Sequence, residues 1–220
     1  MTVRTQIIVA VVAMFISSAA QAQYNSRAQT WEFGAQLLNS SSMTSSGVEG
    51  SSLRVSSDTG WGIGVNYNFS NRLSVGFGFD WLTPSYEATY IPEIGLQPIT
   101  LRHKLDATTW SGKGTFYFVE GAISPYIEAG IGYTNIDSNV ADGPPVTGCW
   151  WDPWWGYICS NFYSTYSDTR FSYSGTLGVR WDINREYGLK VGYGLMTIDT
   201  KSQTEDPEFD MWRAELYWRF

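Results

Sequence analysis

Two cysteines are the residues of this sequence with the clearest chemistry. Cys149 and Cys159 are its only cysteines, and nine residues separate them. Two thiols at this spacing can form a disulfide or, with further ligands, bind zinc. No histidine or third cysteine lies nearby, which disfavours zinc, so we expect a disulfide if the chain reaches an oxidising compartment. Such a bond would close a short loop and stabilise it by about 2–3 kcal/mol in the chain-entropy model.

Tryptophans crowd the segment between these cysteines. Trp150, Trp151, Trp154 and Trp155 lie there, and four indole rings are costly to leave in water. Three roles are open to them: packing against the rest of the protein, insertion into a lipid layer, or binding a sugar or another partner. Packing on the body of the protein is the role expected for a patch of this size, and a contact surface is the alternative.

The remaining residues with possible site chemistry give weak patterns. His103 is the only histidine, and its neighbours Arg102 and Lys104 supply no serine or carboxylate for catalysis, so we expect an exposed loop residue and no enzyme. Asp206, Glu208 and Asp210 alternate and could bind divalent cations, but a solvated acidic rim is the stronger expectation. No cofactor and no resident metal are expected.

The composition excludes several classes of protein. Of the 220 residues, 43% are apolar, 16% aromatic and only 16% charged, against about 25% charged in a typical soluble domain. The 22 glycines and 11 tryptophans argue against disorder. A net charge of -7 without a basic stripe argues against a nucleic-acid partner. Beyond residue 22, no apolar run reaches the length of about 20 residues that a transmembrane helix needs.

The first 22 residues have the features of an export signal. Arg4 precedes an apolar stretch from Ile7 to Ile16, and the sequence Ala20-Gln21-Ala22 fits a cleavage site between small residues. We therefore interpret residues 1–22 as a secretory signal peptide, with an uncleaved core segment as the alternative. Because no cysteine follows the site, a lipid anchor is not expected, and the mature domain covers residues 23–220.

Apolar residues then alternate with small or polar residues in eight segments. A period of two is typical of β-strands that have two unlike faces. The segments are 31–37, 61–69, 73–81, 110–118, 127–134, 171–182, 187–195 and 212–220. The fourth has the weakest pattern, because Gly112 and Gly114 fall on its apolar face.

The connections between these segments alternate in length. Long ones follow the odd-numbered segments and short ones the even-numbered segments. The long connections are 40–59, 83–104, 137–168 and 197–207, and the short ones are 70–72, 119–124 and 184–186. Transmembrane β-barrels show this asymmetry, with short periplasmic turns and longer outer loops. Since a signal peptide delivers the N-terminus to the periplasm, we expect both termini on that side and the long connections outside.

The apolar face must point outward. A soluble lipocalin-like barrel would place it inside, but the interior of an eight-stranded barrel is too narrow for roughly forty large side chains. The other face carries Gly, Ser, Asn and Thr with few charges, unlike an exterior that meets water. The expected fold is therefore all-β: an eight-stranded antiparallel up-and-down transmembrane β-barrel.

Aromatic residues on the apolar face gather near the two ends of the segments, where the interfaces of a membrane would lie. The outer row is Trp61, Trp81, Trp110, Tyr133, Tyr173, Tyr193 and Trp212. The inner row is Trp31, Phe69, Phe118, Trp181, Tyr187, Trp218 and Phe220. Aromatics of an ordinary core would not be expected to form two such bands.

Charged residues on the polar face are balanced in sign. The carboxylates are Glu32, Asp80, Glu128, Asp182 and Glu215, and the bases are Lys113, Arg180, Lys190, Arg213 and Arg219. Because an unpaired buried charge is costly, five against five predicts a salt-bridge network that fills the lumen. Arg219 lies close to the chain end, so we expect it to be hydrated at the rim and outside this network.

Three local patterns make the chain resemble a known group. They are Gly60–Phe69 followed by Ser70–Leu73, the segment Pro125–Tyr133, and the terminal segment Leu216–Phe220. Together they resemble the small eight-stranded outer-membrane barrels of Gram-negative bacteria, the OmpW, OmpX, OmpA-barrel and opacity-protein group. The resemblance implies that Trp218 and Phe220 form a C-terminal insertion signal, read by the barrel-assembly machinery as a transient partner. The long connection 137–168 departs from the OmpW pattern.

Two functions remain open for such a protein. The first is a structural or surface-interaction role carried by its extracellular loops, with membrane lipid and lipopolysaccharide as surroundings and the extracellular ligand unspecified. The second, implied by the likeness to OmpW, is a narrow channel for small or hydrophobic solutes. The balanced lumen charges favour the first, because a filled lumen does not conduct.

Overall fold

In the computed structural model, the described parts of the chain are residues 26–46, 52–90, 97–141, 144, 146–162, 165–199 and 207–220. The regular elements of these parts are all strands. No helix within these ranges has the length and apolar character needed to cross a membrane. The proposed signal peptide, residues 1–22, lies outside the described residues.

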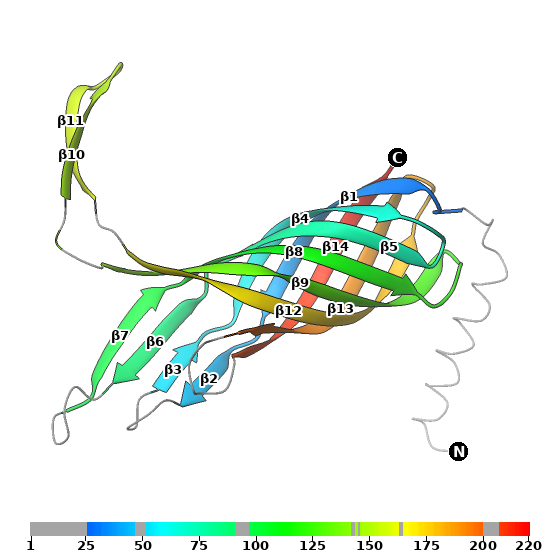
Figure 1. The fold of residues 1–220 in the computed structure, drawn as a ribbon, viewed down its shortest axis with the longest axis horizontal. Coiled ribbons are helices and arrows are strands. Elements are labelled where there is room, and N and C mark those ends of the chain that lie inside the picture. The colour runs from blue at the N-terminus through cyan, green and yellow to red at the C-terminus, as the bar shows by residue number, and fades with distance from the viewer. Residues whose placement is uncertain are drawn as a thin grey trace.

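Eight strands close into one antiparallel barrel, as predicted (Figure 1). Around the barrel the order is β1, β14, β13, β12, β9, β8, β5 and β4, so each strand pairs with the barrel strands next to it in sequence. Their bounds are β1 Thr30–Ser40, β4 Asp58–Asn68, β5 Leu73–Leu82, β8 Asp106–Tyr117, β9 Ile123–Ala141, β12 Thr165–Asp182, β13 Tyr187–Ile198 and β14 Glu208–Arg219. Closure leaves the barrel without a free sheet edge. A bilayer requires this, because it offers no water to the backbone groups of an open edge.

The first and last barrel strands are joined at one end by Trp31 and Phe220. The amide of Trp31 donates to the carbonyl of Phe220 at 3.0 Å, and the amide of Phe220 donates back at 2.9 Å. The three short turns lie at this same end, which we name the turn end. The opposite end, where the long connections leave the barrel, is the loop end (Figure 1).

The two faces of the barrel strands divide as the sequence pattern predicts. Along β1, Trp31 is 49% exposed whereas Glu32 is fully buried, and the alternation continues to Ser40. Every residue of the two predicted aromatic rows is at least 40% exposed on the outer surface. Within the outer row the register pairs Trp61 with Trp81 and Tyr193 with Trp212. The outer surface is therefore apolar, with aromatic rows near both ends.

Glycines on the inner face make room for large side chains from across the lumen. A Cβ atom at Gly178 would lie 2.6 Å from the ring of Tyr126, and one at Gly78 would lie 2.8 Å from the Nζ atom of Lys113. Both distances are shorter than Cβ atoms tolerate. The small inner residues therefore reflect an interior that is filled rather than open.

The first two long connections contain a second sheet that the alternation pattern did not predict. It has four antiparallel strands in the order β2, β3, β6 and β7, and it extends from the loop end (Figure 1). The bounds are β2 Met43–Ser46, β3 Ser52–Val55, β6 Ser85–Tyr90 and β7 Ile99–Lys104. Pairing of β3 with β6 ties the two connections together.

The third long connection is largely strand as well. β9 and β12 remain paired beyond the barrel, up to Ala141 and Thr165. The chain then forms a separate hairpin of β10, Val146–Asp152, and β11, Gly156–Phe162. Figure 1 shows this hairpin projecting well away from the barrel.

Candidate functional site

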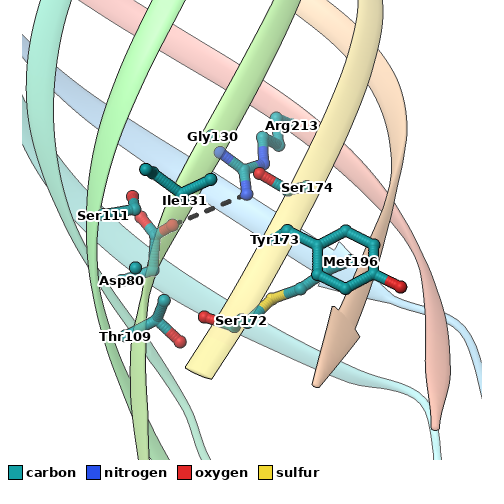
Figure 2. Close-up of a pocket in the computed structure, with 11 residues that line it drawn as sticks. Asp80, Thr109, Ser111, Gly130, Ile131, Ser172, Tyr173, Ser174, Met196 and Arg213 are labelled. Atoms are coloured by element: carbon teal, nitrogen blue, oxygen red, sulfur yellow. Dashed lines mark ion pairs between the residues drawn. The ribbon is translucent and has the colours of Figure 1, made fainter. Parts of the chain in front are cut away.

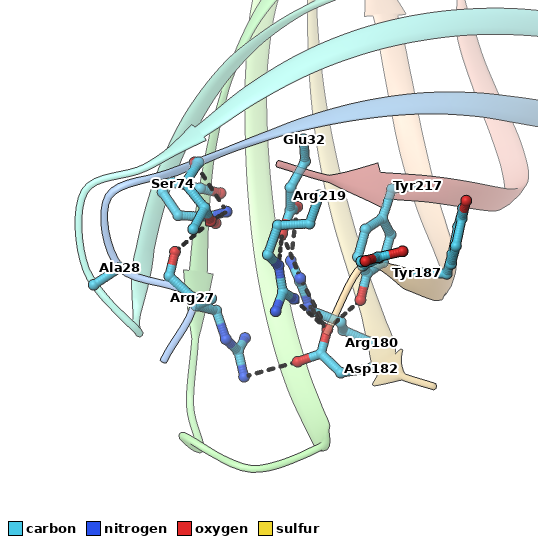
Figure 3. A network of polar contacts seen from close by, with 12 residues as sticks. Arg27, Ala28, Glu32, Ser74, Arg180, Asp182, Tyr187, Tyr217 and Arg219 are labelled. Carbon is cyan, nitrogen blue, oxygen red and sulfur yellow. Dashed lines mark hydrogen bonds and ion pairs between the residues drawn. The ribbon is translucent and has the colours of Figure 1, made fainter. Parts of the chain in front are cut away.

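Buried ion pairs fill the turn end of the lumen (Figure 3). Arg180 is fully buried and binds Glu32 through the two terminal nitrogens of its guanidinium. The Nη2 atom lies 2.5 Å from Oε1 of Glu32, and the Nη1 atom lies 2.9 Å from Oε2. The Nε atom of Arg180 also donates to Asp182 at 2.9 Å. A bidentate arrangement of this kind is the strongest geometry for an arginine–carboxylate pair.

Arg219 belongs to this cluster, so its predicted hydration at the rim is wrong. Its side chain is 5% exposed, its Nε atom donates to Glu32 at 3.1 Å, and its Nη2 atom donates to Asp182 at 2.7 Å. The physical reason is the closure of the barrel. Since β14 pairs with β1 as far as Phe220, the residue before the chain end still points into the lumen.

Arg27 is a sixth cation that the sequence interpretation missed, and it ends the predicted balance of five against five. It lies ahead of β1, is 2% exposed, and reaches Asp182 at 3.7 Å and the carbonyl of Gly121 at 2.9 Å. We name Arg27, Glu32, Arg180, Asp182 and Arg219 the turn-end network. Arg27 stands outside every alternating segment, so the pattern contained no signal for it.

A second group of charges lies further along the lumen, towards the loop end. Asp80 is 3.8 Å from the Nζ atom of Lys113 and 3.6 Å from the Nη2 atom of Arg213, and it accepts a hydrogen bond from Gln36. Arg213 also lies 3.8 Å from Glu128, which accepts a hydrogen bond from Thr115.

Lys190 links the two groups. Its Nζ atom is 3.2 Å from Glu215 and 3.9 Å from Glu32. All nine predicted network residues therefore point into the lumen and contact an opposite charge.

Tyrosines complete the filling of the lumen, and the sequence interpretation overlooked them. Tyr117 and Tyr217 are nearly inaccessible, and Tyr126 is 5% exposed. Tyr117 accepts a hydrogen bond from Arg180 at 3.0 Å, Tyr217 donates to Asp182, and the Arg180 guanidinium lies 4.2 Å from the centroid of the Tyr217 ring. A signal for them exists, because each lies two positions from a residue already placed on the inner face.

The cysteine pair forms the predicted disulfide. Cys149 and Cys159 are directly opposite each other in β10 and β11, with their Cα atoms 4.1 Å apart. At the tip, Asp152 accepts hydrogen bonds from the amides of Trp154 and Trp155 at 2.8 and 2.9 Å. Gly156 closes the turn with a φ of 77°, which only glycine adopts easily.

The described aromatic side chains of the hairpin are exposed, so for Trp151, Trp154 and Trp155 the expected packing on the body of the protein is wrong. Trp151 is 70% exposed, Trp154 87%, Trp155 81% and Tyr157 71%. The reason is that the extended β9–β12 pair carries the hairpin away from the barrel (Figure 1). We name these four residues the hairpin aromatic surface. Trp150 pairs with Ile158 through the backbone register, and its side chain is outside the described part.

The other candidate residues that the structure describes lie at the loop end, apart from the lumen charges and from the hairpin. His103 lies in β7 opposite Tyr86, is exposed, and lines an open surface pocket together with Ser56 and Ser85. Tyr86 donates to the carbonyl of Ser138 at 3.1 Å, and burial raises the pKa of its hydroxyl. Asp210 accepts a hydrogen bond from Tyr193 at 2.7 Å, Glu208 lies in β14, and Asp206 is outside the described residues. Across the described ranges, no three potential ligands gather for a metal ion.

Trp218 and Phe220, the predicted insertion signal, lie on the outer surface at the turn end. They are 48% and 64% exposed, and their ring centroids are 5.3 Å apart. Their side chains are thus presented towards the lipid next to the strand pair that closes the barrel.

A closed antiparallel barrel with an apolar exterior, two aromatic rows and an ion-paired lumen defines an integral membrane β-barrel. The sequence matches the family model for the outer membrane protein beta-barrel domain over residues 8–220. The chain therefore belongs to this family and is an integral protein of the outer membrane. No curated protein matches the chain at a significant level of sequence similarity.

Solved structures of small outer-membrane barrels are similar in fold. Neisserial surface protein A superposes with a TM-score of 0.57 at 12% identity, covering 86% of this chain and 97% of its own. OprG from Pseudomonas aeruginosa has a TM-score of 0.52 at 14% identity, covering 88% of this chain and 96% of its own. Ail, the attachment invasion locus protein of Yersinia pestis, has a TM-score of 0.50 at 13% identity, covering 88% of this chain and 99% of its own. At these identities the likeness concerns the fold alone, and it confirms the predicted resemblance to small eight-stranded barrels.

Proposed function

We propose that this protein is a surface-interaction protein whose loop end contacts other molecules outside the cell. The observation that carries the proposal is the hairpin aromatic surface, in which four large rings are at least 70% exposed on a disulfide-linked hairpin. Tryptophan and tyrosine are enriched where proteins contact partners, because they bury a large area at low entropic cost. The described turn end of the lumen offers no comparable open surface, since charges and tyrosines fill it.

The orientation that this role needs is part of the proposal. Residues 1–22 are a cleaved signal peptide, residues 23–220 form the barrel domain, and both termini face the periplasm. The loop end, including the hairpin, then faces the exterior. Support comes from the short turns and from Trp31 and Phe220, which lie together at one end. The barrel-assembly machinery is the transient partner proposed for Trp218 and Phe220.

The first partner we propose is the saccharide part of lipopolysaccharide, because in this orientation it surrounds the loop end. The strands β10 and β11 and their turn contain a single charged residue, Asp152. An uncharged aromatic surface suits a polyhydroxylated, weakly apolar partner better than a strongly charged one. The lipid that surrounds the barrel contacts the apolar outer face and its aromatic rows. No enzymatic step, cofactor or nucleic acid enters this proposal.

A binding experiment tests the proposal. The purified protein in nanodiscs is applied to immobilised core oligosaccharide of lipopolysaccharide, beside a variant with Trp151→Ser, Trp154→Ser and Trp155→Ser. The matched control is Ile99→Ser with Leu101→Ser, which removes exposed apolar side chains from β7. We expect the hairpin variant to lose at least tenfold in affinity and the control to keep it. Equal binding by the wild type and the hairpin variant would contradict the contact role.

A narrow channel for small or hydrophobic solutes is the second candidate. One observation favours it: the lumen becomes apolar at the loop end, where Met196, Ile198 and Met211 are buried together. The turn-end network opposes it, because any solute would have to displace fully buried ion pairs. A liposome swelling assay with small solutes distinguishes the two, since only a channel makes swelling depend on the protein.

A further inference from the structure

The loop end of the lumen contains an apolar cavity of about 220 Å³, which we name the loop-end cup. Its apolar lining includes Val55, Leu82, Ile136, Met196, Ile198 and Met211. The cup arises where the inner face changes character along single strands. In β13, for example, the inner face carries Lys190, Gly192 and Gly194 and then turns to Met196 and Ile198.

The walls of the cup offer very little to a polar ligand. The threonine hydroxyls that reach it are already hydrogen-bonded within the protein. The Oγ1 atoms of Thr109 and Thr134 lie 2.9 Å apart, and the hydroxyl of Thr134 donates to the Oγ atom of Ser172 at 3.0 Å. A cavity of about 150 Å³ lined by aliphatic and aromatic groups binds benzene, so the cup has room for roughly eight to ten carbon atoms.

On the turn-end side of the cup lies a small polar pocket, which Figure 2 shows. Thr109 and Met196 line both spaces, so the two adjoin. The pocket holds about 10 Å³, and Ser111, Asp80 and Arg213 are among its lining residues. It is therefore the floor of the cup, with room for one small polar group.

Two buried groups at this floor have no hydrogen-bond partner among the residues that the structure describes. They are the Oγ atom of Ser111 and the Nη1 atom of Arg213, on residues that are only 7% and 8% exposed. Unpartnered buried polar groups are uncommon and costly, and they occur where a ligand or a water completes the site. Both can donate a hydrogen bond to an acceptor at the floor.

The charges at the floor decide the kind of acceptor. Arg213 already lies 3.6 Å from Asp80 and 3.8 Å from Glu128, while Lys113 lies 3.8 Å from Asp80. Two bases face two carboxylates, so the floor has no excess positive charge for another anion. An added carboxylate would be repelled by Asp80, whereas a neutral oxygen would not.

We propose that the loop-end cup binds a single-chain amphiphile with an uncharged, hydrogen-bonding head. The hydrocarbon chain occupies the cup, and the head oxygen accepts hydrogen bonds from Ser111 and Arg213. This inference does not depend on the hairpin or on its partner. The apolar part of the lumen is then a binding site and not a channel. The charged residues on its turn-end side prevent a bound ligand from passing through the barrel.

The methionines provide a direct assay. The chain has five, of which Met1 and Met14 lie in residues 1–22, while Met43, Met196 and Met211 all line the cup. With methyl-13C methionine, the mature protein in nanodiscs therefore reports only on this cavity. The probes are 1-octanol, n-octane and octanoate. We expect saturable methyl shifts with octanol, and about tenfold weaker binding of octanoate.

Three variants separate the parts of the proposal. Ala107→Phe places a ring in the cup and should abolish the shifts with octanol and octane, while the heat-modifiable gel shift shows that the barrel still folds. Ser111→Ala should weaken octanol about five- to tenfold and leave octane unchanged, because it removes one hydrogen bond to the head. Ser74→Ala, a buried serine near Tyr117 at the turn end, is the matched control and should change neither.

The outcomes are decisive in each direction. Saturable octanol binding that Ala107→Phe abolishes and Ser111→Ala weakens supports the site. Shifts that persist in Ala107→Phe, or no saturable shift at all, would overturn it, because octanol would then only dissolve in the surrounding lipid. Octanoate binding as tightly as octanol would overturn the uncharged head.

Discussion

Arg180 and Glu32 form a bidentate ion pair inside the barrel, although they are 148 positions apart in the sequence. Arg180 lies in β12 and Glu32 in β1, on strands that are not neighbours in the sheet, and both side chains are inaccessible. The pair therefore joins two parts of the barrel wall across the lumen (Figure 3). Closing the lumen at the turn end leaves the loop end as the part of the molecule open to other functions.

Removing Arg180 tests how much this pair stabilises the barrel. Arg180→Ala leaves Glu32 buried beside fewer cations, which costs about 3–5 kcal/mol when one half of a buried pair is lost. We expect a lower urea midpoint and a heat-modifiable gel shift at lower temperature. The matched control is Arg72→Ala, because Arg72 pairs with Glu120 at 2.8 Å on the surface, and such pairs contribute about 1 kcal/mol or less. Equal effects of the two substitutions would contradict a stabilising turn-end network.

A glycine substitution tests whether the lumen is filled. Gly178→Val should destabilise the barrel by about 1–3 kcal/mol, because its side chain would meet both the carbonyl oxygen of Val191 and the ring of Tyr126. Combining it with Tyr126→Ser should recover part of the loss in urea unfolding. Gly114→Val is the control, since a Cβ atom there meets nothing within 4 Å. If Gly178→Val unfolds at the wild-type urea concentration, the interior has more space than the structure shows.

Labelling of intact cells tests the proposed orientation. Single cysteines replace Ser56 or Thr147 at the loop end, and Asn71 or Arg185 at the turn end, in a background with Ser at 149 and 159. A membrane-impermeant maleimide should label the first two and spare the last two until the outer membrane is permeabilised. Labelling of the variant Arg185→Cys in intact cells would reverse the orientation, and with it the place of the hairpin.

The disulfide should matter to the hairpin and not to the barrel. Replacing Cys149 and Cys159 with Ser should leave insertion and the heat-modifiable gel shift unchanged, because the closed ladder of the barrel satisfies its backbone groups without the bond. Protease cleavage near Trp154 should become faster, since the hairpin loses its covalent link. Two free thiols in the mass spectrum of the purified wild-type protein would remove the basis of this prediction.

Much of the barrel follows from the sequence alone, because each strand has one face in lipid and one in the lumen. Such a strict environment produces a strict period of two, so the alternation by itself places Glu32 and Lys190 on the inner face. The disulfide was predictable for a different reason, since these two cysteines are the only pair available.

Other features depend on long-range contacts that leave little local signal. The pairing of β3 with β6 forms because the barrel brings two separate connections side by side. Arg27 is buried because it folds back to Asp182 and Gly121, far away in the sequence. Tyr117 and Tyr217 have the period of inner-face residues, but their aromatic rings are typical of the lipid-facing side, so period and residue type point to opposite faces. The exposure of the hairpin rings depends on how far β9 and β12 stay paired.

The central claim is that the lumen is closed and that the protein acts through its loop end. Single-channel recording of the purified wild-type protein in a planar bilayer tests this most directly. A closed lumen predicts no unitary conductance steps above the baseline of the bare bilayer, because the turn-end network leaves no continuous water path. Reproducible unitary steps whose size changes in Arg180→Ala would contradict the account and establish the channel as the function.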